Sequence, residues 1–167
     1  MGEIESIIEK LQLKPHPEGG YYSETYRSAG EISAADLGSD FSGKRSFSTA
    51  IYFLLTPKMF SAFHRIRSDE MWHFYKGAPI ALHMIDAEGR YSEKTIGNDI
   101  LNGEHPQFMV PAGVWFASHT KGESSYSLAG CTVSPGFDFQ DFELANRNEL
   151  IKKYPMYKNI IKQLTRV

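Results

Sequence analysis

The stretch His64-Arg65-Ile66-Arg67-Ser68-Asp69-Glu70, with Gly77 after six further residues, decides the fold of this chain. It joins two strand-like segments, 60–67 and 70–75, through a short polar turn. We predict that both are β-strands, in which successive side chains point to opposite faces. On the second strand Glu70 therefore shares a face with Trp72, so an inward Glu70 places both side chains in the same cavity.

Further short segments with strand-like composition lie on both sides of this stretch. They are residues 21–27, 47–55, 80–85, 91–96, 107–110, 114–119, 126–133 and 137–142. Turn signals separate them about every 8–12 residues, which is typical of an all-β sandwich or barrel and not of alternating βαβ units. The sequence therefore predicts one all-β domain over residues 1–167.

Helices are expected only at the two ends of the chain. Ile4, Ile7, Ile8 and Leu11 give a helical period to residues 3–12, and the Pro- and Gly-rich segment 15–20 ends that helix. Near the other end, Asn146 is placed as a helix N-cap, and helical segments continue to residue 164. Residues 28–45 are small and polar, so we expect a loop there.

Composition limits the class of partner. The chain has 18 Lys and Arg against 20 Asp and Glu, so it lacks the basic surface that nucleic acid requires. The longest apolar run is too short to span a bilayer, and we expect no membrane partner. The single cysteine, Cys131, cannot form an internal disulfide and stands in an apolar strand, which favours a cytoplasmic protein with an inert core thiol.

Five motifs occur in order along the chain. They are residues 16–22 (His-Pro-Glu-Gly-Gly-Tyr-Tyr), 26–28 (Tyr-Arg-Ser), 68–72 (Ser-Asp-Glu-Met-Trp), 106–113 (Pro-Gln to Val-Pro-Ala-Gly) and 134–139 (Ser-Pro-Gly-Phe-Asp-Phe). With the spacing of His64, Glu70 and Gly77, these motifs resemble the cupin superfamily and, within it, the cupin-5 family of uncharacterised function. The resemblance implies a jelly-roll, or double-stranded β-helix, barrel.

The same resemblance implies four positions for metal ligands in a cupin barrel. In this chain those positions hold His64, Ile66, Glu70 and Phe116, and two of the four have no lone pair to donate. Two protein ligands rarely hold a transition metal tightly. We therefore expect no metal and no other cofactor.

Two hypotheses about function remain open. In the first, the chain is a non-catalytic cupin whose pocket binds a sugar-like or other polar metabolite. In the second, it is a metal-independent sugar isomerase or epimerase with His64 as general base, Glu70 or Asp138 orienting it, and Tyr22, Tyr26 or Tyr52 as acid. A buried structural pair of His64 with Glu70 would explain the motif without either function.

The candidate site residues follow from these hypotheses. The catalytic candidates are His64, Glu70 and Asp138, and the ligand-binding candidates are Tyr22, Arg27, Trp72, Gln107 and Phe116. Beyond a small-molecule metabolite, the expected partner is a second copy of the chain, because cupins of this resemblance commonly pair and the aromatic content exceeds what one small barrel encloses.

Overall fold

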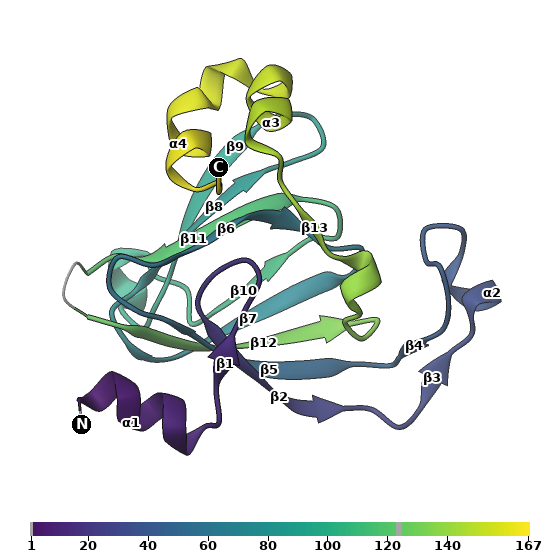
Figure 1. Cartoon of the computed structure of the whole chain (residues 1–167), viewed down its shortest axis with the longest axis horizontal. Helices are drawn as coiled ribbons and strands as arrows, with labels where there is room; N and C mark the ends of the chain where they lie inside the picture. Colours follow the sequence, from purple (N-terminus) through teal and green to yellow (C-terminus); the bar gives the residue numbers. More distant parts are fainter. Residues whose placement is uncertain (1, 123–124) are drawn as a thin grey trace.

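The computed structural model describes residues 2–122 and 125–167, and two antiparallel sheets face each other in it (Figure 1). The six-stranded sheet has the order β1 (Lys14–Pro15), β2 (Tyr21–Arg27), β5 (Thr49–Leu55), β12 (Ser127–Ser134), β7 (Asp69–Gly77) and β10 (Gln107–Val110). The five-stranded sheet has the order β13 (Glu143–Leu144), β6 (Phe60–Arg65), β11 (Trp115–Thr120), β8 (Ile80–Ile85) and β9 (Tyr91–Ile96). From β5 to β13 successive strands alternate between the two sheets, except that β8 and β9 pair with each other, which agrees with the predicted jelly roll.

The main core fills the space between the sheets. Phe53 and Trp72 enter it from the six-stranded sheet, and Leu82 and Phe116 enter from the five-stranded sheet. Each is at most 1% exposed, so both sheets turn an apolar face inward. Burial of this area is the main favourable term for the barrel.

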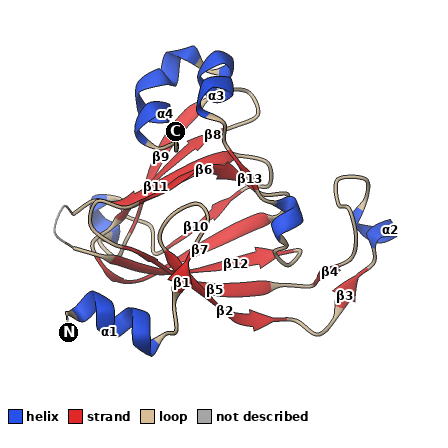
Figure 2. Cartoon of the chain, in the orientation of Figure 1, coloured by secondary structure: helices blue, strands red, loops and turns tan. Residues whose placement is uncertain are grey.

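Helices cover the outside of the barrel at its ends (Figure 2). The helices α3 (Arg147–Lys153) and α4 (Lys158–Gln163) pack Leu150 and Ile161 against Phe63 and Trp115 on the outer face of the five-stranded sheet. Asn146 caps α3 as predicted, since its side chain accepts from the N–H groups of Asn148 and Glu149. The helix α1 (Glu3–Lys10) confirms the predicted terminal helix. No helix in the described ranges is long and apolar enough to cross a membrane.

Two sequence predictions about local structure are wrong. The expected loop 28–45 contains β3 (Glu31–Ile32) and α2 (Ala34–Leu37) and runs into β4 (Arg45–Ser46), which pairs with β3. In Figure 1 this segment projects from the side of the barrel, and the buried Arg45 fixes its base through two hydrogen bonds to Asp141.

The second error is the strand expected at 137–142. This segment forms the short 3-10 helix η2 (Phe139–Asp141) instead, because the Asp138 side chain accepts a hydrogen bond from the Gln140 N–H and favours a turn. The remaining 3-10 helices are η1 (Ile100–Asn102) and η3 (Pro155–Tyr157).

Candidate functional site

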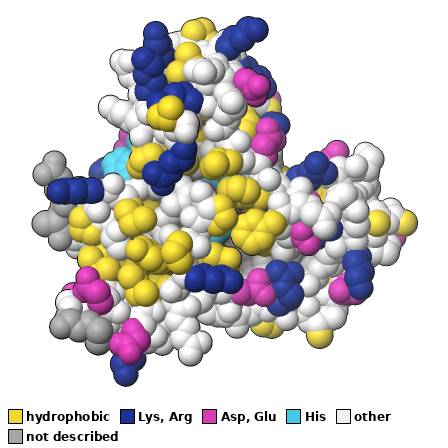
Figure 3. Space-filling model, viewed as in Figure 1, with side chains coloured by type: hydrophobic (Ala, Val, Ile, Leu, Met, Phe, Trp, Pro, Cys, Tyr) yellow, Lys and Arg dark blue, Asp and Glu magenta, His cyan; other side chains and the backbone are white. Residues whose placement is uncertain are grey.

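A cavity of about 430 Å³ opens between the two sheets. Strands β2, β5, β6, β7 and β12 supply its walls, and the segments 14–18 and 137–142 border it. Its apolar lining is mostly aromatic and consists of Tyr22, Ile51, Phe53, Ile66, Trp72, Val133, Phe137, Phe139 and Phe142. The volume of this cavity suits a small metabolite. Outside the cavity, hydrophobic side chains also gather on the surface between the C-terminal helices and α1 (Figure 3).

A tight turn before β2 brings Glu18 into the barrel. Its backbone closes through hydrogen bonds from the His16 N–H to Gly20 O and from the Gly19 N–H to His16 O. Gly19 has a φ of +112°, and a Cβ there would collide with the carbonyl oxygen of Phe60. Only glycine fits this position. The turn docks on β6 because Glu18 O accepts from the Ala62 N–H.

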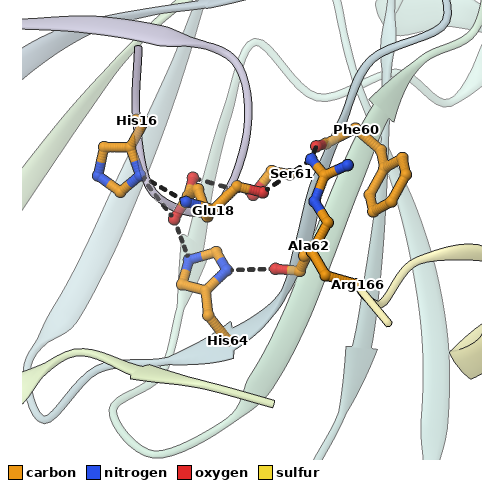
Figure 4. Close-up of polar contacts among 7 residues, drawn as sticks. All are labelled: His16, Glu18, Phe60, Ser61, Ala62, His64 and Arg166. Carbon is orange, nitrogen blue, oxygen red and sulfur yellow. Dashed lines mark hydrogen bonds and ion pairs between the residues drawn. The ribbon is translucent and has the colours of Figure 1, made fainter. Parts of the chain in front are cut away.

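The Glu18 carboxylate lies against His64 (Figure 4). His64 Nε2 is 2.9 Å from Glu18 Oε2, and the other carboxylate oxygen accepts from the Ser61 hydroxyl at 2.9 Å. On its opposite side, His64 Nδ1 donates to the carbonyl of Ala62 at 2.7 Å. Since both ring nitrogens face acceptors, the arrangement favours the imidazolium form, with a proton on each nitrogen.

The pKa directions of this pair agree with the geometry. Burial alone would lower the pKa of His64, but the charge and hydrogen bond of Glu18 raise it above its ordinary value. Burial alone would raise the pKa of Glu18, but His64 holds it below its ordinary value, with help from His16 and Ser61. The two side chains therefore form a buried ion pair near neutral pH. Neither His64 nitrogen has a free lone pair, so the expected role of His64 as general base does not fit the structure.

Glu70 is the second buried carboxyl of the cavity, and its surroundings are different. Burial, followed by repulsion from Glu18, raises the pKa of Glu70 to about 7. Within residues 2–122 and 125–167 its carboxyl forms no ion pair. The charge of His64 and hydrogen bonds from Cys131 and Trp72 lower its pKa, but by less than burial and Glu18 raise it. The Glu70 carboxyl therefore exchanges a proton near physiological pH, while Glu18 stays ionised.

The structure brings most of the predicted residues to one place. Tyr22, Arg27 and Trp72 line the cavity together with His64 and Glu70, and Trp72 shares the inner face of β7 with Glu70 as alternation predicts. Arg27 is held at the rim by two hydrogen bonds to Glu24 and one to Phe137 O. Of the tyrosines considered as acids, Tyr22 borders the cavity, whereas Tyr26 and Tyr52 do not.

Four expectations about site residues need correction. Glu70 does not orient His64, because Glu18 occupies that role. Asp138 borders the cavity from a turn and not from a strand, with one carboxylate oxygen accepting from the Gln140 N–H. Gln107 lies outside the cavity on the edge strand β10 and bonds to His73.

The fourth correction concerns Phe116, which was expected to bind the ligand. Its ring packs against His64, with centroids 4.1 Å apart, but it lies in the core and does not line the cavity.

Sequence reasoning missed Glu18 and His16. Both stand in the motif 16–22, which served only to identify a resemblance and a turn. The signal available was a carboxylate and an imidazole inside a Pro- and Gly-rich turn, where a conformationally demanding backbone often positions functional side chains.

The residues at the cupin metal positions do not fit a metal. Phe116 stands opposite His64 in the sheet, Ile66 offers only carbon to the cavity, and both nitrogens of His64 are already bonded. In the described part of the chain, no group of three or more His, Cys, Asp or Glu side chains is arranged to hold an ion.

Comparison with known proteins identifies relatives over nearly the whole chain. The family model Cupin_5, described as "Cupin superfamily (DUF985)", matches residues 5–145. The crystal structure of protein SO0799 from Shewanella oneidensis and the solved structure of a hypothetical protein from Leishmania major each share 38% identity with this chain, at a TM-score of 0.89. The alignments cover 99% of this chain with 99% and 100% of those chains. The uncharacterized protein YML079W of Saccharomyces cerevisiae is 30% identical over 158 residues, which are 89% of this chain and 78% of that protein.

Proposed function

The chain belongs to the Cupin_5 family of the cupin superfamily, and we propose that its cavity binds a small, uncharged, hydroxyl-bearing metabolite of sugar size. The observation that carries this proposal is the Glu70 carboxyl, buried in an aromatic cavity without an ion-pair partner in the described ranges. A carboxyl in such a place is costly unless a ligand satisfies it. Ligand hydroxyl groups supply both donors and acceptors to such a group.

Charge pairing around the cavity supports an uncharged ligand. The negative charge of Glu18 is compensated by His64, and at the rim Arg27 is paired with Glu24. Lys14, which also lines the cavity, has its ammonium group over the Tyr22 ring, 5.1 Å from the centroid. A charged ligand would have to be desolvated without a free counter-charge from these pairs. The aromatic side chains of the lining offer flat apolar surfaces to the carbon-bearing face of a sugar ring. Tyr22 and Trp72 are the side chains that we expect to stack on it.

A second candidate function is proton transfer in an isomerase or epimerase. The observation that favours it is the pKa of Glu70, raised to about 7, since a general base works best when its pKa lies near the working pH. In this version Glu70 replaces His64 as the base, and Tyr22 is the acid because it lines the same cavity. Two carboxyl groups whose surroundings separate their pKa values are a recurring sign of acid–base chemistry.

The binding proposal is tested by ligand-induced thermal stabilisation with neutral sugars and polyols. We expect at least one of them to raise the melting temperature of the wild-type protein in proportion to the logarithm of its concentration. Glu70→Leu should shift that response to higher ligand concentration while leaving the fold intact, because leucine suits the apolar surroundings. The matched control is Gln107→Ala, on the same sheet but outside the cavity, which should respond like the wild type.

The outcomes separate the two functions. Stabilisation that is undiminished in Glu70→Leu would refute the assignment of this cavity, and so would a panel without any response. For the bound sugar, proton NMR in deuterated water then measures exchange of carbon-bound hydrogen. Exchange that disappears in Glu70→Gln supports the isomerase or epimerase, and binding without exchange supports the non-catalytic function.

A further inference from the structure

His16 has one ring nitrogen that its structural role does not explain. Its Nδ1 accepts a hydrogen bond of 3.2 Å from the Glu18 N–H, which stabilises the turn before β2. The other nitrogen, Nε2, points away from Glu18 in Figure 4 and makes no hydrogen bond within the described ranges. The side chain is only 7% exposed, and its ring lines the cavity.

The hydrogen bond at Nδ1 determines the tautomer of His16. The Glu18 carboxylate oxygen Oε2 lies 3.6 Å from the same nitrogen, beyond hydrogen-bond distance, whereas the backbone N–H is within it. A backbone N–H can only donate, so Nδ1 presents its lone pair. A neutral imidazole then carries its proton on Nε2. Burial favours the neutral ring and lowers the pKa of His16, and the charge of the neighbouring His64 acts in the same direction against the attraction of Glu18. His16 is therefore a neutral donor with a fixed orientation.

The surroundings of the ring restrict what this donor can bind. Tyr22, Phe53, Phe139 and Phe142 surround it, with ring centroids between 4.6 and 6.2 Å away. Three of these four rings are phenylalanines and offer no acceptor. A ligand hydroxyl at Nε2 would bring a hydrogen that needs its own acceptor, whereas a carbonyl oxygen is satisfied by a single donor.

From this arrangement we infer that His16 donates from Nε2 to a carbonyl oxygen of the ligand, and that the ligand is a neutral hydroxycarbonyl compound such as an open-chain ketose. This inference rests on the proposed function, since it names the substrate class of the same cavity. Glu70 contacts a hydroxyl of that ligand, and His16 distinguishes a carbonyl compound from the corresponding polyol or amine. An ammonium group is rejected because it has no lone pair and only its hydrogens could face the Nε2–H.

The first test is the tautomer itself, read by nitrogen-15 NMR of the histidine side chains without any ligand. We expect an unprotonated Nδ1 and a protonated Nε2 for His16, and two protonated nitrogens for His64. Loss of the signals in His16→Asn assigns them. A His16 protonated at Nδ1 would overturn the inference whatever the protein binds.

The second test compares probes with one carbon skeleton. These are dihydroxyacetone with a carbonyl at its central carbon, glycerol with a hydroxyl there, and serinol with an ammonium group. We expect dihydroxyacetone to bind about tenfold more tightly than glycerol, which corresponds to one well-placed hydrogen bond. Serinol should bind more weakly than both.

Two variants separate the donor from the turn. His16→Asn places an amide oxygen where it can keep the bond from the Glu18 N–H but puts nothing at the position of Nε2, so the preference for dihydroxyacetone should disappear. His16→Gln reaches that position with an amide N–H, and part of the preference should return. Unchanged preference in His16→Asn, or equal binding of dihydroxyacetone and glycerol by the wild type, would overturn the role of His16.

Failure of the proposed function gives a different pattern. Glu70→Leu should weaken dihydroxyacetone and glycerol by a similar factor, because both carry hydroxyls, and leave their ratio unchanged. If Glu70→Leu weakens neither probe, or if neither probe binds the wild type, the cavity is not the proposed site and the ligand assignment falls with it.

Discussion

Replacement of Glu70 by glutamine should make the protein more stable at alkaline pH. The pKa of this carboxyl rises from an ordinary 4.5 to about 7 in the folded protein, chiefly because burial disfavours its charge. Ionising Glu70 in the folded state therefore costs roughly 3 kcal/mol relative to the unfolded chain. Glutamine has nearly the same shape and no charge, so it avoids this cost.

The expected pH dependence follows from which state holds the proton. Between its unfolded and folded pKa values, Glu70 is protonated in the native protein and ionised in the unfolded chain. Its contribution to stability therefore falls as pH rises from 4.5 and levels off above about 7. Relative to the wild type, Glu70→Gln should gain about 3 kcal/mol across this window. At alkaline pH this gain corresponds to about 6–12 °C in melting temperature for a chain of this size.

The assay is urea unfolding followed by circular dichroism at several values between about pH 4.5 and 8.5. The free energy of unfolding of Glu70→Gln is compared with that of the wild type at each pH, and the informative result is how this difference changes with pH. An effect of the amide that does not depend on pH adds the same amount at every pH. Glu9→Gln, an exposed carboxyl on α1, is the control and should run parallel to the wild type. A difference that stays constant from the lowest to the highest pH would refute the buried, protonated Glu70.

Further predictions concern the turn, the ion pair, metal content and assembly. Gly19→Ala should lower the free energy of unfolding by at least about 2 kcal/mol, because alanine is strained at this φ and its Cβ would collide with the carbonyl oxygen of Phe60. An unchanged midpoint of urea unfolding would contradict the described turn. Glu18→Gln and His64→Asn should each lower the free energy of unfolding by about 3–5 kcal/mol, and the double variant should lower it by less than the sum of the two. Additive losses in this double-mutant cycle would contradict the ion pair. Elemental analysis of the untagged protein should find no stoichiometric transition metal, and about one ion per chain, lost in His64→Ala, would be the contrary result. We also propose a homodimer, because several aromatic side chains remain about half exposed, and sedimentation at the mass of one 18.9 kDa chain would count against it.

The strands could be predicted from the sequence because their signals are local. The predicted ranges 21–27, 80–85, 91–96 and 107–110 coincide with β2, β8, β9 and β10, where strand-like composition and flanking turn residues agree. The strand predicted at 137–142 is wrong because the turn preference of Pro135, Gly136 and Asp138 outweighs the aromatic composition of that segment.

The site could be predicted only where one strand determines it. Alternation along β7 was enough to place Glu70 beside Trp72 on the inner face. The face on which Gln107 lies, in contrast, depends on how β10 is aligned with β7. Gln107 pairs with His73 on the outward face of β7, and no residue near Gln107 in the sequence specifies that pairing. Glu18 reaches His64 only after the turn docks on β6, a contact between distant parts of the chain.

The separation of His64 from Glu70 gives the site its chemistry. In the cupin resemblance these two side chains serve one metal, but here the chain supplies another carboxylate, Glu18, and His64 is fully engaged by it. Glu70 is left in the cavity with the repulsion of Glu18 and the cost of burial, and both effects keep its proton in place to near neutral pH. Two glutamates in one cavity thus have different states: Glu18 is ionised and paired with His64, whereas Glu70 keeps its proton up to a pKa of about 7. If Glu18 is replaced by glutamine, the repulsion disappears, but burial, the larger cause, still keeps the pKa of Glu70 high. The state of Glu70 therefore depends mainly on the aromatic walls that would also hold the ligand.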